Sequence, residues 1–456
     1  MNRHVQSSRA KPENRGRREF LSLSGRLAAV SAMASFAVPA VHAAENNTLR
    51  LALIGSGSRG SGAVVNAMSV AGPPLQLVAM ADIFDYRLAG SLKALTKQLG
   101  DRIDVPRDRQ FLGFDAYRKA IDCLRPGDVA ILTTYSGFRP THFEYAVAKG
   151  VNVFMEKTFA PDPAGIRRVL KAGEAAQAKN LKIATGLMCR HSSARQALIA
   201  KIREGALGQI QLVRTYRMET HLPLRPRKPQ EPELLWQIRA PERIFWVAGG
   251  SFHDRTVHLI DEMCWLKDAW PVTAHGVGGR SPDNIDAGQD LDSYSVEYTF
   301  ADGTKGLAVA RYIPNCYPEF ATFVHGTKRA AQFSGNIHAP TVSLHEDQRI
   351  VPGNIQWKPE RERVSPYVAE WEVLLDAIRN DRPHNEVRRS AYSDLATLMG
   401  RAAVHTGKIV TWEEAMSSNF AFCPNVDSLT KDSPAPVHAD AAGRYPAPVP
   451  GKWSEL

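Results

Sequence analysis

Two short stretches of the chain carry side chains that could move a proton. Glu156 and Lys157 stand at the end of an apolar run, and Asp254 and His258 are four residues apart. Oxidation of an alcohol requires a base within hydrogen-bond reach of the hydroxyl proton while hydride leaves the carbon. Lys157 can be that base, because partial burial and a nearby positive charge, such as that of a cofactor ring, both lower the pKa of its amine. The alternative is a lysine that only pairs with Glu156.

Asp254 and His258 belong to a helix that the pattern predicts from Ser251 to Leu266. Residues four apart share one face of a helix, so both side chains can hold one substrate. Two alternatives stay open: Ser251 and Asp254 form S-x-x-D, the pattern of a capping box, and His258 can be a core histidine. Asp-x-x-x-His could also bind a metal, but a third ligand is not evident, and we predict no metal site.

A third motif is the sequence Gly55-Ser56-Gly57-Ser58-Arg59-Gly60. It matches G-x-G-x-x-G and lies between a predicted strand, Leu49–Ile54, and a predicted helix, Ser61–Met68. In a dinucleotide site the first glycine makes the turn, the second lets a pyrophosphate approach and the third lets helix and strand pack. We therefore expect Gly55, Gly57, Ser58, Arg59 and Gly60 to bind a cofactor. The alternative is an ordinary glycine-rich turn.

The next predicted strand, Leu75–Ala81, ends at Asp82. A carboxylate there can accept hydrogen bonds from the adenosine ribose and repels a 2′-phosphate, which favours NAD over NADP. Arg87 follows five residues later and could accommodate that phosphate. Asp82 could equally be a helix cap.

The elements that must position these groups alternate between strand and helix. Strands are expected at Val129–Thr133 and Val151–Met155, with a helix between them from Thr141 to Lys149. This alternation predicts a doubly wound parallel sheet, whose ligands bind beyond the carboxyl ends of the strands. The polar residues expected to reach the cofactor there are Thr134, His142 and Glu156.

The second half of the chain has a different pattern of predicted strands and helices. A strand over Leu181–Gly186 leads to Arg190, a predicted substrate contact, and a helix follows from Ala194 to Glu204. Strands joined by turns, without helices between them, predict a mainly antiparallel sheet. These strands are Gln209–Arg217, Tyr294–Phe300, Gly306–Ile313 and Phe320–Gly326.

Three further segments complete this half. Residues 235–239 form a predicted loop in which Trp236 and Arg239 suit a sugar, although Trp236 could simply anchor a surface loop. Helices from Pro366 to Arg379 and from Ala391 to His405 are expected to pack back on the first domain. Residues 420–456 are rich in proline and predict an extended arm.

Composition excludes several classes of protein. The 456 residues are 44% hydrophobic and 23% charged, as in globular proteins of about two domains. Residues 1–43 hold seven basic and two acidic residues, so half of the net charge of +10 lies there. The rest shows no basic stripe with interleaved aromatic residues, so we expect no nucleic-acid partner. Beyond the N-terminus no apolar run approaches the ~20 residues of a membrane span, which predicts a soluble mature protein.

The N-terminus has the pattern of an export signal. Arg17 and Arg18 precede an apolar segment, Leu27–Val38, and residues 41–43 offer a small-x-small cleavage pattern. The segment resembles a twin-arginine signal, which implies a periplasmic or otherwise exported protein that folds and acquires its cofactor before export. The alternative is an amphipathic helix that stays attached. The odd number and wide spacing of the five cysteines argue against a disulfide framework and predict buried thiols at all five positions.

Together the motifs resemble the glucose–fructose oxidoreductase, inositol dehydrogenase and rhizopine catabolism (Gfo/Idh/MocA) family. The resemblance rests on GSGSRGSG, on GVNVFMEKTFA in place of a Glu-Lys-Pro element, and on HDRTVHLID in place of Asp-x-x-x-His; it spans about residues 48–410. It implies catalysis between two domains, with Lys157 as acid/base and Asp254 and His258 facing the substrate. Thr158 and Tyr135 depart from the family, which usually has proline there.

The resulting prediction has five parts along the chain. They are a signal peptide (1–43), an NAD(P)-binding Rossmann domain (48–185), a C-terminal substrate and oligomerisation domain (186–365), two helices that pack back on the Rossmann domain (366–410) and the arm (420–456). The predicted function is an exported oxidoreductase that acts on a sugar, cyclitol or glycoside, as a homo-oligomer with tightly bound cofactor. Two alternatives remain: redox-assisted glycoside cleavage without net redox change, and a non-catalytic binding protein of the same fold.

Overall fold

The computed structural model describes residues 48–221, 223–228, 230–336, 338 and 341–456. The predicted signal peptide lies outside the described residues. Among the described residues no helix has the length and apolar character needed to cross a membrane.

The first sheet is parallel and has the strand order β3-β2-β1-β4-β5-β6. Its central strands are nearly continuous apolar runs and are buried, as strands covered by helices on both faces must be. The strands are β1 (Leu49–Ile54), β2 (Leu75–Asp82), β3 (Gln110–Leu112), β4 (Val129–Leu132), β5 (Asn152–Met155) and β6 (Ile183–Thr185). The helices between them are α2 (Ser58–Met68), α3 (Asp85–Leu99), α4 (Ala116–Asp122), α5 (Arg139–Ala148) and α6 (Pro163–Ala178).

This strand order places the turn after β1 beside the turn after β4. The Thr133 N–H donates to the Ile54 carbonyl at 2.8 Å, so the two strand ends are in direct contact. The chain leaves β1 toward one side and β4 toward the other, which creates the crevice where doubly wound sheets bind ligands.

The second sheet has nine strands in the order β14-β13-β12-β11-β7-β10-β9-β8-β15. Its neighbours are antiparallel except for β7 and β10, which run parallel. The strands are β7 (Ile210–Met218), β8 (Thr273–Gly279), β9 (Ser293–Thr299), β10 (Lys305–Arg311), β11 (Glu319–Gly326), β12 (Ala330–Ser334), β13 (Ser343–His345), β14 (Ile355–Trp357) and β15 (Val410–Thr411). The predicted fold class, a Rossmann sheet plus a second, mainly antiparallel sheet, is confirmed.

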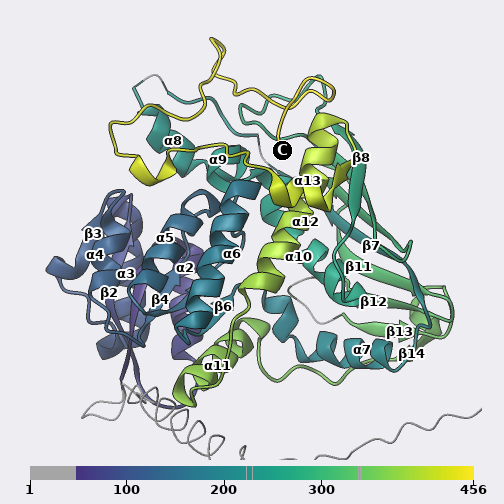
Figure 1. Ribbon diagram of the computed structural model, residues 1–456, viewed down its shortest axis with the longest axis horizontal. Coiled ribbons are helices and arrows are strands. Elements are labelled where there is room, and N and C mark those ends of the chain that lie inside the picture. The colour runs from purple at the N-terminus through teal and green to yellow at the C-terminus, as the bar shows by residue number, and fades with distance from the viewer. Residues whose placement is uncertain (1–47, 222, 229, 337, 339–340) are drawn as a thin grey trace, which may run out of the picture. The chain divides into compact units, whose positions relative to one another are not determined.

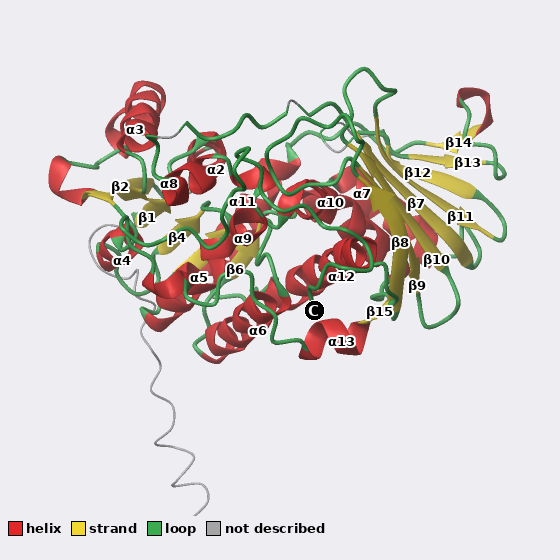
Figure 2. Cartoon of the chain, turned by 90° about the horizontal axis from the view of Figure 1, so that it is seen from above, coloured by secondary structure: helices red, strands yellow, loops and turns green. Residues whose placement is uncertain are grey.

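Two long helices, α10 (Gly250–Lys267) and α12 (Val387–Thr406), lie between the sheets (Figure 2). They pack on each other, α12 also contacts α6 and β8, and α7 (Ser193–Arg203) lies beside β12. Helix α11 (Pro366–Arg379) packs on the first sheet, where Trp371 stacks on Phe154 at 4.4 Å. Residues from both halves of the chain therefore meet along α10 and α12.

Residues 420–456, the C-terminal arm, run over the short helices α8 (Glu233–Arg239) and α9 (Phe245–Ala248), as Figure 1 shows in yellow. The carboxylate of Glu233 accepts hydrogen bonds from Tyr445 Oη at 2.8 Å and from the Ala439 N–H at 3.1 Å. Farther along, Glu455 is buried and pairs with Arg401 on α12 at 2.9 Å. Another short helix, α13 (Trp412–Ser417), precedes the arm.

All five cysteines are free thiols. Cys189, Cys264 and Cys423 are buried as predicted, and Cys123 is partly buried. Cys316 is exposed, in the turn after β10, so the expectation of a buried thiol is wrong there.

Candidate active site

The glycine-rich turn has the geometry of a phosphate cradle. A Cβ atom on Gly60 would lie 2.2 Å from the Gly55 carbonyl oxygen, so α2 can pack on β1 only with glycine there. Gly55 has a φ of +97°, which also favours glycine. A Cβ on Gly57 would meet no atom within 4 Å, so the space in front of this residue is open. Gly57 caps α2 without a side-chain hydrogen bond, which leaves first-turn N–H groups for an anion.

This turn borders a cavity of about 550 Å³, the nucleotide cavity. Its walls come from the ends of β1, β2 and β4 and from the segment around α8. The lining residues are Gly55, Ser56, Gly57, Ser58, Arg59, Gly60, Asp82, Ile83, Phe84, Arg87, Thr133, Thr134, Tyr135, Phe138, Ile238 and Glu242.

Asp82 is held with its carboxylate in this cavity. It accepts hydrogen bonds from the Ser56 N–H at 2.7 Å and the Phe84 N–H at 2.9 Å. Burial raises its pKa, against the lowering effect of these two hydrogen bonds. The helix-cap alternative is wrong, since the N-cap of α3 is Phe84. A fixed acceptor beside the phosphate cradle fits a ribose.

Arg87 lines the same cavity, and its guanidinium lies 5.0 Å from the centre of the Phe84 ring. It is close enough to Asp82 for the two charges to interact. A carboxylate and a guanidinium are therefore both available in the same part of the cavity.

The residues predicted after β4 take different places. Thr134 lines the nucleotide cavity, whereas His142 lies behind it, in the wall of a smaller cavity that also contains Asp82 and Phe138. His142 Nδ1 is 3.1 Å from the Thr134 hydroxyl, and its ring stacks on Tyr117 at 4.2 Å. Burial and the charges of nearby arginines lower the pKa of His142 to about 3. The imidazole is neutral at physiological pH.

Glu156 faces Arg59 and lies outside the lining of the nucleotide cavity. Its carboxylate is 2.5 Å from Arg59 Nε, and it is 6% exposed. The Arg59 guanidinium also lies 4.7 Å from the centre of the Tyr367 ring and 3.7 Å from the buried Glu370 carboxylate. Glu156 thus contacts the glycine-rich turn through Arg59 and immediately precedes Lys157 in the chain.

Lys157 and Asp254 are 97 positions apart in the sequence, and their side chains form an ion pair. Lys157 Nζ donates to Asp254 Oδ1 at 2.9 Å and to the Asp254 main-chain oxygen at 2.6 Å. The lysine side chain therefore pairs with Asp254 and not with Glu156, whose carboxylate only accepts a hydrogen bond of 3.3 Å from the Lys157 backbone N–H. The Lys157–Thr158 peptide bond is cis. Burial opposes ionisation of Asp254, but the Lys157 charge and hydrogen bond bring its pKa below the usual value.

The capping-box interpretation of Ser251 and Asp254 is wrong. Helix α10 begins earlier, with Gly249 as N-cap and without a side-chain cap hydrogen bond. The Ser251 hydroxyl instead donates to Asp290. Asp254 is therefore free of the helix terminus and available to Lys157.

His258 lies one turn further along α10. Its pKa is well below the usual value because of burial, with further lowering by Lys157 and Arg217 and an opposing effect of Asp254. Within the described part of the chain its Nδ1 atom is buried and has no hydrogen-bond partner. The site thus places the Lys157–Asp254 ion pair near a neutral imidazole.

Asp394 on α12 fixes the position of Lys157 relative to α10. One of its carboxylate oxygens accepts from the N–H groups of Phe159 at 2.7 Å and Ala160 at 3.2 Å, and the other is 2.6 Å from His253 Nε2. Asp394 and His253 are both fully buried. One carboxylate therefore holds the turn after Lys157 and the helix that bears Asp254.

The site is surrounded by further polar and charged side chains. Sequence reasoning did not single these residues out. Glu219 pairs with Arg217 at 2.9 Å and with Arg255 at 3.0 Å, and its pKa falls to about 2 against the effect of burial. Tyr367 Oη is 3.3 Å from His338 Nδ1. Arg255 lies inside the HDRTVH motif, so the sequence could have indicated it. Its contacts with Glu219 and Glu242 could not be foreseen, because those residues come from other segments of the chain.

The three predicted substrate contacts have other partners. Arg190 pairs with both carboxylate oxygens of Asp261 at 2.8 Å. The predicted loop at 235–239 is wrong, since these residues belong to α8; there Trp236 is 6% exposed and stacks on Tyr445 of the C-terminal arm. Arg239 pairs with Glu231 at 2.7 Å. None of these contacts brings the three side chains to Lys157.

No cluster of three or more potential metal ligands occurs among the residues that the structure describes.

Comparison with solved structures shows the same fold in several sugar and cyclitol enzymes. An aldose-aldose oxidoreductase from Caulobacter crescentus, complexed with glycerol, is 17% identical, with a TM-score of 0.60 over 80% of this chain and 99% of that chain. A scyllo-inositol dehydrogenase from Lactobacillus casei with bound NAD(H) and scyllo-inositol is 19% identical, with a TM-score of 0.58 over 80% and 99%. A myo-inositol 2-dehydrogenase from Lactobacillus plantarum is 17% identical, with a TM-score of 0.56 over the same shares.

Searches of protein-family models and of curated proteins find no match. At these identities the likeness establishes the fold.

Proposed function

We propose that the protein is a nicotinamide-dependent oxidoreductase that acts on a hydroxyl group of a sugar, cyclitol or glycoside. The observation that carries this proposal is the pairing of Lys157 with Asp254 near a neutral His258, in a structure that also has a cavity suited to a dinucleotide. Glu156 links the two: it precedes Lys157 in the chain and pairs with Arg59, which lines the cavity. The neighbours of the same fold are oxidoreductases and dehydrogenases, which agrees with this proposal.

The two side chains divide the proton chemistry between them. An ammonium group has three donors, and Asp254 takes two of those of Lys157, so one remains for the substrate oxygen. His258 is neutral, so its imidazole can accept the hydroxyl proton. A bound nicotinamide supplies the acceptor for hydride. In this scheme Lys157 orients the alcohol and stabilises its developing negative charge, while His258 is the base, a role that the sequence alone had assigned to Lys157.

NAD fits the cavity better than NADP. Asp82 is already oriented by two N–H groups as an acceptor for ribose hydroxyls, and its charge disfavours a 2′-phosphate. Arg87 beside it keeps NADP as the alternative. The Lactobacillus casei neighbour binds NAD(H).

Export with bound cofactor forms part of the same proposal. The N-terminal pattern favours a twin-arginine route, on which a protein must keep its cofactor in a compartment poor in free NAD. The cavity is lined by Ile238 and Glu242, beyond the Rossmann strands, and the C-terminal arm holds α8 in place. These contacts favour slow cofactor release. Regeneration would then use a second sugar, or return hydride to the same molecule during glycoside cleavage.

The test begins with an absorbance spectrum of the purified protein, before and after addition of sugars, cyclitols and glycosides, with any released nucleotide identified. A band near 340 nm that appears with one substrate supports the proposal, and reducing-end products without net NADH identify the cleavage alternative. Lys157→Ala and His258→Ala should bind cofactor but lose turnover, whereas the exposed Lys171→Ala should retain both. Full biological activity of Lys157→Ala would instead favour a binding protein, and failure of NAD and NADP to bind would refute the proposal.

A further inference from the structure

A second cavity, of about 320 Å³, is lined in part by residues that contact Ser251 in the first turn of α10. It is formed by the segment after β7, the loop between β8 and β9 and the end of β10, and we call it the outer cavity. Its lining residues are His221, Pro223, Arg243, Ser281, Asp283, Asn284, Ile285, Asp286, Asp290, Leu291, Asp292, Tyr312, Ile313 and Pro314.

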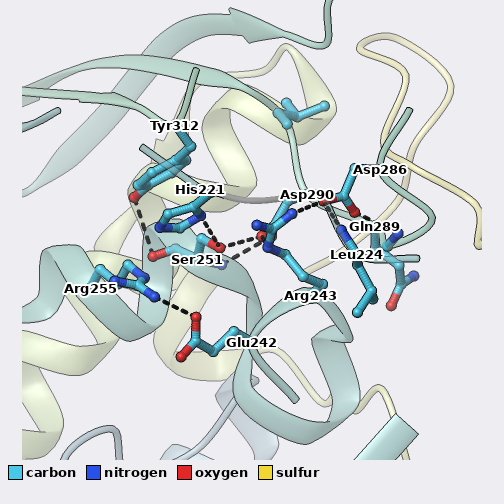
Figure 3. A network of polar contacts seen from close by, with 12 residues as sticks. His221, Leu224, Glu242, Arg243, Ser251, Arg255, Asp286, Gln289, Asp290 and Tyr312 are labelled. Atoms are coloured by element: carbon cyan, nitrogen blue, oxygen red, sulfur yellow. Dashed lines mark hydrogen bonds and ion pairs between the residues drawn. The ribbon is translucent and has the colours of Figure 1, made fainter. Parts of the chain in front are cut away.

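The carboxylates in its wall are held as acceptors. Asp290 accepts from the Ser251 N–H at 2.9 Å and Asp286 from the Leu224 N–H at 2.9 Å, and both pair with Arg243 (Figure 3). An ionised carboxylate has about four acceptor positions, so each retains capacity for a further hydroxyl group. Backbone donors fix these oxygens before a ligand arrives, so binding loses little side-chain entropy.

Besides these and other polar residues, the wall has apolar and aromatic side chains. The His221 and Tyr312 rings stack at 4.4 Å with an angle of 16° between their planes, and they stand together at the cavity in Figure 3. Ile285 is 69% exposed and adds apolar surface to the wall. A cavity with oriented hydroxyl acceptors on one side and flat or apolar surfaces on the other has the mixed character of a sugar ring.

The outer cavity is joined to the candidate active site by short structural links. Ser251, which fixes Asp290, stands on the helix that bears Asp254 and His258, about 4.5 Å and about 10 Å further along the helix axis. His221 is 3.1 Å from Glu219, which pairs with Arg255, and Arg255 pairs with Glu242 in the nucleotide cavity. The outer cavity and the candidate active site therefore both adjoin the first turns of α10.

From these observations we propose that the outer cavity is a subsite for a second, uncharged sugar ring, so that the preferred substrate is a disaccharide or larger glycoside. This inference rests on the proposed oxidoreductase function. Four aspartates face the cavity, against the single paired guanidinium of Arg243, so phosphorylated and uronic acid rings are excluded by charge.

The test compares two exposed isoleucines. Ile285→Arg puts a long cationic side chain among the aspartates of the outer cavity, and Ile409→Arg makes the same change at a position that is 66% exposed and outside that lining. Steady-state rates are measured with glucose and galactose and with cellobiose and lactose. We expect kcat/KM for a disaccharide to exceed that for its monosaccharide by about tenfold or more, and Ile285→Arg to remove most of this advantage. The monosaccharide rates and the Ile409→Arg variant should change less than about twofold.

Equal loss for both sugar classes, or no loss in Ile285→Arg, would overturn the subsite while leaving the oxidoreductase in place. If none of these sugars reduces bound cofactor, equilibrium dialysis with labelled cellobiose decides the matter separately. Binding to the wild type that Ile285→Arg weakens and Ile409→Arg preserves supports the subsite even where the proposed reaction fails. Absence of binding refutes it.

Discussion

Replacement of His142 by phenylalanine should make the protein less stable at neutral pH but more stable in mild acid. Phenylalanine preserves the volume and the stacking on Tyr117, but it leaves the Thr134 hydroxyl without the 3.1 Å contact. Loss of one such hydrogen bond destabilises the variant by about 1 kcal/mol at pH 7.5.

Acid reverses the order because of the depressed pKa of His142. The unfolded chain binds a proton at this histidine below about pH 6.5, whereas the folded protein does not until about pH 3. The folded pKa is lowered, so the wild type loses stability as pH falls through this window, by up to about 1.4 kcal/mol per pH unit. At pH 5 that loss reaches about 2 kcal/mol, which exceeds the hydrogen-bond contribution. The two stability curves should cross near pH 6.

Urea unfolding followed by circular dichroism between pH 5 and 7.5 measures the difference between variant and wild type, in which all other titrating groups cancel. Thr134→Val is the matched control, because it removes the same hydrogen bond and keeps the imidazole; its curve should run parallel to that of the wild type. Parallel curves for His142→Phe would show that His142 does not stay neutral in the folded protein, and the reasoning would fail.

Three further predictions concern the cradle, the site and the arm. Gly57→Ala should keep the melting temperature but weaken NAD binding about tenfold or more, because its Cβ occupies the open space in front of the turn. Gly60→Ala should lower both the melting temperature and the NAD affinity, because its Cβ meets the Gly55 carbonyl oxygen. Calorimetry and thermal unfolding distinguish the two variants, and equal behaviour would contradict the cradle geometry. Asp394→Ala should lower kcat by about 100-fold with little change in the cofactor Kd, since it releases the turn after Lys157 from α10; an unchanged kcat would refute this positioning role. Glu455→Gln should lower the free energy of unfolding by about 3–5 kcal/mol at pH 7, because Arg401 then has an uncompensated buried charge, and a loss below about 1 kcal/mol in urea unfolding would count against it.

The first sheet could be predicted from the sequence because its signals are local. The glycine-rich turn, the strand before it and the helix after it occupy Leu49–Met68, and their geometry depends on atoms within that stretch and on the turn after β4. Asp82 was also found correctly in the cavity, because a polar residue at the carboxyl end of a parallel strand has few other places to point.

The substrate end could not be predicted in the same way, because its contacts join distant residues. Lys157 could pair with Glu156 or with Asp254 on spacing alone, and only the packing of α10 against α12 decides for Asp254. The composition around Trp236 suits a sugar-binding loop equally well, but Tyr445, 209 positions later, covers the ring. Gly249 and Gly250 both have positive φ, which starts α10 before Ser251 and so removes the capping box.

The C-terminal arm also determines when the cofactor can be enclosed. During translation the parallel sheet is complete once residue 185 has been made, so the phosphate cradle can exist early. Glu233 and Trp236 on α8 receive their partners only from Ala439 and Tyr445. The part of the cavity wall that α8 provides is therefore held in place only after almost the whole described chain has left the ribosome. On the proposed function, we expect a nascent chain to exchange NAD freely and the finished polypeptide to release it slowly.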